Sequence, residues 1–91
     1  MKNLNCIVSG EIFDIYTTEK VCKLKVCTTD RSSIILFSVF PTTRKGEVNP
    51  LYNKLKQYKK GDVLFFYVYA YLKDNEIVLY LKNVEPCKVN K

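Results

Sequence analysis

The stretch KGDVLFFYVYAYLKDNEIVLYLK, residues 60–82, decides the fold of this chain. From residue 63 to residue 72 its side chains alternate between two classes, as they do when successive residues of a β-strand point to opposite faces. One face is purely aliphatic or Phe, and the other is mostly tyrosine. The apolar face holds Leu64, Phe66, Val68, Ala70 and Leu72, and the second face holds Val63, Phe65, Tyr67, Tyr69 and Tyr71. A row of amphipathic rings suits a surface that is partly wet and partly covered.

A turn and a second alternating run follow this strand. Residues 73–76, Lys-Asp-Asn-Glu, have the composition of a tight turn, and residues 77–82 resume the alternation with Tyr80 and Lys82 on the polar side. Such a pair of runs predicts a β-hairpin. We therefore expect a hairpin with one apolar face and one face of tyrosines and lysine.

Three earlier segments, residues 4–16, 21–28 and 33–40, alternate in the same way. The first is interrupted at Gly10, and a glycine inside a strand commonly marks a bulge or a sharp bend, as a small barrel needs when one strand serves two sheets. The second carries Lys23 and Lys25 on one face, so that face is expected to be basic. The third is apolar on both faces, which is typical of a central strand.

A short helix is predicted between the third and fourth strands. Residues 41–48 have the composition of a loop, and Asn49-Pro50 is typical of an N-cap and first helical residue. Leu51, Leu55 and Tyr58 then recur at helical spacing, so we expect them in the core, and Gly61 is expected to end the helix. The helix lysines, Lys54, Lys56, Lys59 and Lys60, are expected on a solvated surface.

Length and composition set further bounds. The 91 residues suffice for one domain, and the formal charge of +6 favours an anionic partner. The four cysteines form no C-x-x-C pair and the sequence has no histidine, so we expect free buried or half-buried thiols in a reducing compartment, and no metal or other cofactor. With neither a signal peptide nor a long apolar run, the sequence predicts a cytoplasmic protein without membrane contact.

The order of three strands, one helix and two strands is that of the OB-fold. We therefore predict an all-β domain with one short helix, a five-stranded OB-fold Greek-key barrel spanning residues 1–86, followed by a short tail at 87–91. The sequence also resembles the bacterial single-stranded DNA-binding proteins. The resemblance rests on Ile7–Ile12 with its glycine, on Ile35–Phe40, and on Leu55–Leu64 with its Lys-Gly-Asp entry to the fourth strand.

The resemblance implies a face where aromatic rings stack on bases and basic residues meet phosphates, with Phe40 as a stacking aromatic. The chain departs from the family in three ways: its fourth strand has no glycine, it has no tryptophan, and it lacks an acidic tail. The predicted function is sequence-tolerant binding of single-stranded DNA in replication or repair, with RNA left open. The candidate nucleic-acid-binding residues are Lys23, Lys25, Phe40, Arg44, Lys45, Tyr67, Tyr69, Tyr71, Lys73, Tyr80 and Lys82.

A second hypothesis remains open, because a tyrosine row is as typical of a protein interface as of a base platform. The domain would then be an accessory subunit that docks onto a polymerase, primase or helicase through its aromatic strand, and a homo-oligomer is a further alternative. Catalysis is not expected, since the sequence offers no histidine, no paired acids at metal-binding spacing and no glycine-rich phosphate loop.

Overall fold

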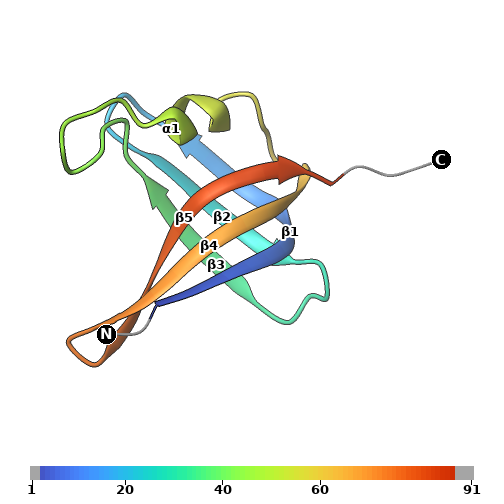
Figure 1. Ribbon diagram of the computed structural model, residues 1–91. Coiled ribbons are helices and arrows are strands. Elements are labelled where there is room, and N and C mark those ends of the chain that lie inside the picture. Colours follow the sequence, from blue (N-terminus) through green and yellow to red (C-terminus); the bar gives the residue numbers. More distant parts are fainter. Residues whose placement is uncertain (1–2, 88–91) are drawn as a thin grey trace.

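The computed structural model describes residues 3–87 and contains five strands and one short helix (Figure 1). In chain order the elements are β1 (Asn3–Thr17), β2 (Cys22–Thr28), β3 (Ile34–Val39), α1 (Pro50–Leu55), β4 (Val63–Lys73) and β5 (Glu76–Pro86). Within residues 3–87 no helix is both long and apolar enough to span a lipid bilayer. Of the predicted tail at 87–91, residues 88–91 lie outside the described residues. Cys87 is still held to the sheet, because its backbone N–H donates to the Val63 carbonyl at 3.3 Å.

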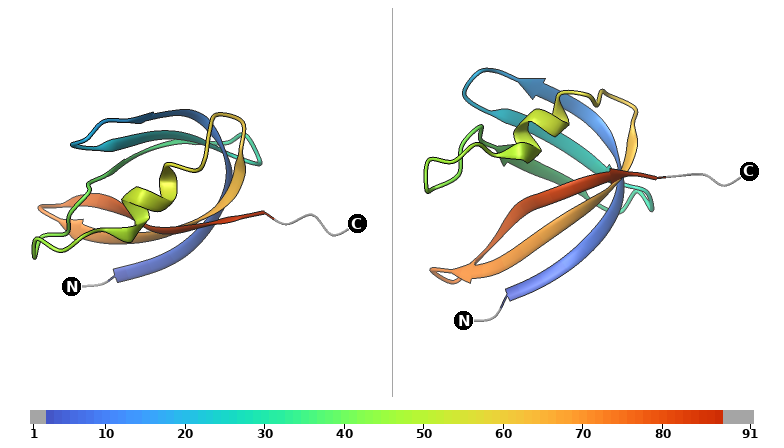
Figure 2. Two further views of the ribbon diagram at one scale, coloured as in Figure 1. Left: turned by 90° about the horizontal axis from the view of Figure 1, so that it is seen from above. Right: turned by 45° about the horizontal axis from the view of Figure 1, so that its top comes forward.

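The five strands form one antiparallel sheet in the order β3-β2-β1-β4-β5. The sheet is strongly curved, so that its β2–β3 half faces its β4–β5 half (Figure 2). The hydrogen-bonded ladder is open: β3 and β5 are its two edges, and the curvature brings these edges close together. The predicted all-β class with one short helix is confirmed.

β1 is the strand that connects the two halves. Its residues Asn3–Glu11 pair with β4, and its residues Gly10–Thr17 pair with β2. Gly10 stands where the two ladders overlap, and a Cβ atom placed there would lie 2.6 Å from Val26 Cγ1. Glycine is therefore required by close approach, while the bulge itself falls between Ile12 and Asp14, three residues after the position where the sequence suggested it.

The core fills the space inside the curved sheet. The rings of Phe37 and Phe66 lie 6.2 Å apart between centroids at an interplanar angle of 15°. The buried apolar side chains of the strands are Ile12, Cys22, Leu24, Val26, Phe37, Val39, Leu64, Phe66, Val68 and Val84. Leu64, Phe66 and Val68 of the predicted apolar set of β4 are thus buried, whereas Ala70 is half-buried and Leu72 is exposed.

The four cysteines are free, as predicted, but they are not all buried. Cys6 is exposed, although its partner across the β1–β4 ladder, Val68, is buried. Cys27 lies on the outer face of β2, whereas Cys22 lies on the inner face, yet Cys27 is also buried. Arg31 covers it, with Nη1 3.8 Å from the Cys27 sulfur and the guanidinium carbon 5.5 Å from the centroid of the Phe13 ring.

α1 begins as the sequence predicted and ends earlier. Asn49 is the N-cap, and its side-chain oxygen accepts a hydrogen bond from the Leu51 N–H at 3.1 Å. The helix stops at Leu55, and Gly61, with φ of +98°, instead lets its N–H reach the Ile12 carbonyl at 2.8 Å. The helix buries Leu51, Tyr52 and Leu55, while Tyr58 packs half-buried against the core.

The β4–β5 hairpin closes through a two-residue turn. Lys73 pairs with Glu76, and the two residues between them, Asp74 and Asn75, have φ angles of 52° and 66°. Positive φ at both central positions is the signature of a type I′ turn, whose twist matches that of the strands it joins. The predicted hairpin is confirmed.

Replacing Gly10 with Ala should lower the free energy of unfolding by about 1–3 kcal/mol, because the new methyl group overlaps Val26 and the surrounding strands must shift. Urea denaturation followed by circular dichroism measures the change. Ser9→Ala, at the neighbouring position of β1, is the control and should have a much smaller effect. Equal midpoints for Gly10→Ala and the wild type would show that the two ladders are not packed as described.

Candidate functional site

Three tyrosines form a cluster on the outer face of the β4–β5 hairpin. The strand register places Tyr69 directly opposite Tyr80. The Tyr71 and Tyr80 rings stack with centroids 5.5 Å apart at 22°, and the Tyr69 and Tyr71 centroids are 5.9 Å apart at 39°. We call Tyr69, Tyr71 and Tyr80 the tyrosine cluster. Its rings are half-buried or exposed, so they remain available to a ligand.

Two basic side chains lie against this cluster. Arg44, from the loop between β3 and α1, donates from Nη2 to the Tyr80 hydroxyl at 3.1 Å. The Lys82 ammonium lies 5.7 Å from the centroid of the Tyr69 ring. Within residues 3–87 neither cation is paired with a carboxylate, so both are free to meet an anionic ligand.

The two stacked phenols ionise differently. The Tyr71 and Tyr80 hydroxyl oxygens are 3.3 Å apart, and this hydrogen bond raises the pKa of Tyr71 and lowers that of Tyr80. The hydrogen bond from Arg44 and the nearby charges of Arg44 and Lys73 lower the pKa of Tyr80 further. The Tyr80 hydroxyl therefore lies in a local positive field, of the kind that also attracts anionic groups.

A groove of about 760 Å³ lies beside the cluster, over the place where the edges β3 and β5 approach each other. Its walls come from the end of β3, from the loop that follows and from the tyrosine cluster. Phe40, which directly follows β3, lines this groove and is 56% exposed. Phe40, Arg44 and the tyrosine cluster, although distant in sequence, thus share one surface.

The outer face of β2 and β3 continues this surface. Lys23 and Lys25 are exposed, and the register sets them opposite Ser38 and Leu36. A second groove runs over this face and shares Ser38 with the first. The two grooves are therefore neighbours, and together they extend from the β2 lysines to the tyrosine cluster.

Sequence reasoning missed Tyr16 and Leu36 on this face. Tyr16 lies on β1 opposite Lys23 and is 63% exposed, and Leu36 is 70% exposed. Successive side chains of a strand point to opposite faces, so the burial of Phe37 implies that its neighbour Leu36 points outward. The position of Tyr16 depends on the shift at the β1 bulge, for which the sequence carries no clear signal.

Three predicted residues lie apart from the cluster. Tyr67 is on the same outer face but nearer the other end of β4, where its hydroxyl donates to Glu85 at 2.6 Å, a bond that raises the Tyr67 pKa. Lys73 precedes the hairpin turn, and its charge reaches Tyr80. Lys45 is exposed in the loop next to Arg44, without an ion pair among the described residues.

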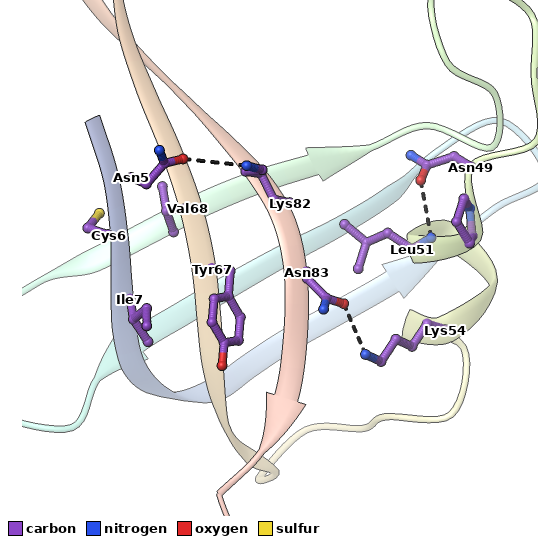
Figure 3. A pocket seen from close by; sticks show the side chains of 11 residues that line it. Asn5, Cys6, Ile7, Asn49, Leu51, Lys54, Tyr67, Val68, Lys82 and Asn83 are labelled. Atoms are coloured by element: carbon purple, nitrogen blue, oxygen red, sulfur yellow. Dashed lines mark hydrogen bonds between the residues drawn. The ribbon is translucent and has the colours of Figure 1, made fainter. Parts of the chain in front are cut away.

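A further hollow of about 750 Å³ crosses β1, β4, β5 and α1 (Figure 3). Lys54 Nζ donates to Asn83 Oδ1 at 2.9 Å, and Lys82 Nζ donates to Asn5 Oδ1 at 3.5 Å. Tyr67 lines this hollow as well as the polar groove around Glu85. Lys54, expected on a solvated helix surface, is instead half-buried and turned toward β5.

Among the residues that the structure describes, no group of three or more His, Cys, Asp or Glu side chains could hold a metal ion. Comparison with protein-family models, with curated proteins and with solved structures finds no match to this chain. The site must therefore be interpreted from its own geometry.

Replacing Arg44 with Gln should raise the pKa of Tyr80, because the substitution removes a charged hydrogen-bond donor to its hydroxyl. The ¹³Cζ resonances of labelled tyrosine, followed by NMR during an alkaline titration, measure this pKa, and Tyr80→Phe assigns the signal. Lys45→Gln, which removes the neighbouring loop charge, is the matched control. If both loop variants shift the Tyr80 pKa equally, Arg44 does not contact the hydroxyl in solution.

Proposed function

We propose that this chain is an OB-fold domain that binds single-stranded DNA without sequence preference. The element order, the antiparallel five-stranded sheet and the approach of β3 to β5 all support this fold. Closed or nearly closed barrels of this type present loops and an outer strand face to extended ligands. The grooves over β2–β3 and over the β3–β5 approach occupy such a face.

The observation that carries the proposal is the tyrosine cluster with its two cations, Arg44 and Lys82, which form no ion pair with a carboxylate among residues 3–87. Base stacking on an aromatic ring contributes about 1–3 kcal/mol per base, and it tolerates every base because each has a π-face. Phenol rings that are partly exposed and already stacked on one another are preorganised for this role. Arg44 and Lys82, which lie against these rings, would supply positive charge to the phosphates of a stacked strand.

The strand would run from the exposed β2 lysines, across Ser38 and Phe40, to the tyrosine cluster. Lys23 and Lys25 supply phosphate contacts at one end, and Arg44 does so at the other. On binding, Arg44 would exchange its hydrogen bond to a neutral phenol for one to a phosphate anion. This exchange costs little, because the bond to the anion is the stronger of the two. The net charge of +6 adds long-range attraction for the polyanion.

Lys82 favours nucleic acid over the adaptor hypothesis. The buried centre of a protein interface is enriched in tyrosine and arginine but depleted of lysine. Here the Lys82 ammonium lies 5.7 Å from the centroid of the Tyr69 ring. A nucleic acid uses rings and cations together, so the domain would serve replication or repair by holding unpaired DNA.

Tyr71→Ala and Tyr80→Ala should each weaken binding of a fluorescent oligo-dT by about 10- to 100-fold, as expected from the loss of one stacked base. Phe65→Ala is the matched control: it removes a ring of similar exposure, 39% against 41% for Tyr80, on the same face but away from the cluster. Anisotropy titration at low salt measures the affinities, with duplex DNA as competitor. Equal affinity for duplex and single strand, or equal losses for Phe65→Ala and Tyr80→Ala, would contradict the proposal.

The combined substitution Lys23→Gln and Lys25→Gln should make the salt dependence shallower. Two lost phosphate contacts correspond to a slope of log affinity against log salt that is less steep by about 1.4. Lys56→Gln with Lys59→Gln removes the same charge from exposed positions at and beyond the end of α1, and should change the slope far less. An unchanged slope in the β2 variant would exclude these lysines from the binding surface.

A further inference from the structure

The hollow that crosses β1, β4, β5 and α1 is lined by basic and neutral residues and by no acidic one (Figure 3). Lys54, from α1, donates to the neutral amide of Asn83 at 2.9 Å. Lys82, from β5, donates to the neutral amide of Asn5 at 3.5 Å. Within residues 3–87 neither lysine is paired with a carboxylate. Two positive charges thus lie at one hollow without a counter-charge, which favours an anionic ligand.

The same hollow offers an aromatic ring. Tyr67 lines it and is half-buried, and its hydroxyl is held by the hydrogen bond to Glu85 at 2.6 Å. Glu85 lines the adjoining groove and not the hollow, so its carboxylate marks where a surface for phosphates must end. The hollow therefore combines a ring with cations, as the tyrosine cluster does.

The hollow adjoins the tyrosine cluster. Lys82 lines the hollow, and its ammonium also lies 5.7 Å from the centroid of the Tyr69 ring. Tyr67, Tyr69 and Tyr71 follow one another on the outer face of β4, and the four residues from Tyr71 to Tyr67 span about 13 Å. Asn49 lines both the hollow and the groove beside the cluster. One extended ligand can therefore occupy both surfaces.

We propose that the hollow extends the DNA-binding surface and takes the nucleotides that follow those stacked on the tyrosine cluster. This inference rests on the proposed function, because it needs a DNA strand on the cluster. A base stacks on the ring of Tyr67, and the ammonium groups of Lys82 and Lys54 bind phosphates. Each lysine then exchanges a hydrogen bond to a neutral amide for a stronger one to an anion.

The extension makes affinity depend on the length of the DNA strand. OB-folds hold about 4–16 nucleotides. A strand at the lower end of this range binds at the tyrosine cluster, because the cluster offers three rings where the hollow offers one. A strand at the upper end reaches the hollow as well. Lys54 and Tyr67 therefore contribute to the binding of the long strand and not to that of the short one.

Anisotropy titrations of the purified chain with fluorescent oligo-dT of about four and about sixteen nucleotides test the extension. Lys54→Gln should bind the short strand like the wild type, and should make the salt slope for the long strand less steep by about 0.7, as expected for one phosphate contact. Tyr67→Ala should weaken the long strand about tenfold. Tyr67→Phe keeps the ring and loses only the bond to Glu85, so it should bind both strands like the wild type.

Lys56→Gln is the matched control for Lys54→Gln, because it removes the same charge at the end of α1 but outside the hollow. Unchanged binding of the short strand also shows that each variant is folded. If Lys54→Gln and the wild type bind the long strand with equal affinity and equal salt slope, the extension is overturned and the proposed function stands.

A loss that is the same for both lengths, or the same for Lys56→Gln as for Lys54→Gln, also overturns the extension, because the effect is then not tied to the hollow. If the wild type binds neither strand, the proposed function fails and the extension fails with it. Failure of the extension alone and failure of DNA binding are thus separate results.

Discussion

The structure depends on the close contact between Gly10 and Val26. Because position 10 has no side chain, β1 can pair with β4 along its first half and with β2 along its second half, and it can bend where the two ladders overlap. The bend curves the sheet around its core and brings the two edge strands together. A bulkier residue at position 10 would force the two halves apart, and the edges β3 and β5 would separate with them.

The proposed binding surface is a consequence of this curvature. Arg44 and Tyr80 are far apart in the sequence, and their contact exists because the β3–α1 loop reaches across to β5. Phe40 shares a groove with the tyrosine cluster for the same reason. One face of the β4–β5 hairpin thereby gains aromatic and basic character, while the opposite face of the same strands stays apolar.

Much of this could be predicted from the sequence, since a period of two separates the buried Leu64, Phe66 and Val68 from the aromatic side chains of the opposite face. The Asn49 cap and the tight turn after Lys73 also followed from local chemistry. What depends on strand register and bulges did not follow. The stacking of Tyr71 on Tyr80 and the hydrogen bond of Tyr67 to Glu85 depend on the β4–β5 register with its bulge. The place of Tyr16 opposite Lys23 depends on the β1 bulge.

The most direct test of the account is a map of the binding surface by NMR, with a short oligo-dT titrated into labelled protein. We predict that the resonances of Phe40, Arg44, Tyr71 and Tyr80 shift together and saturate together, with those of Lys23 and Lys25 following along the second groove. Shifts confined to other surfaces, or spectra that do not change at low salt, would contradict the claim that these rings and cations form one site for single-stranded DNA.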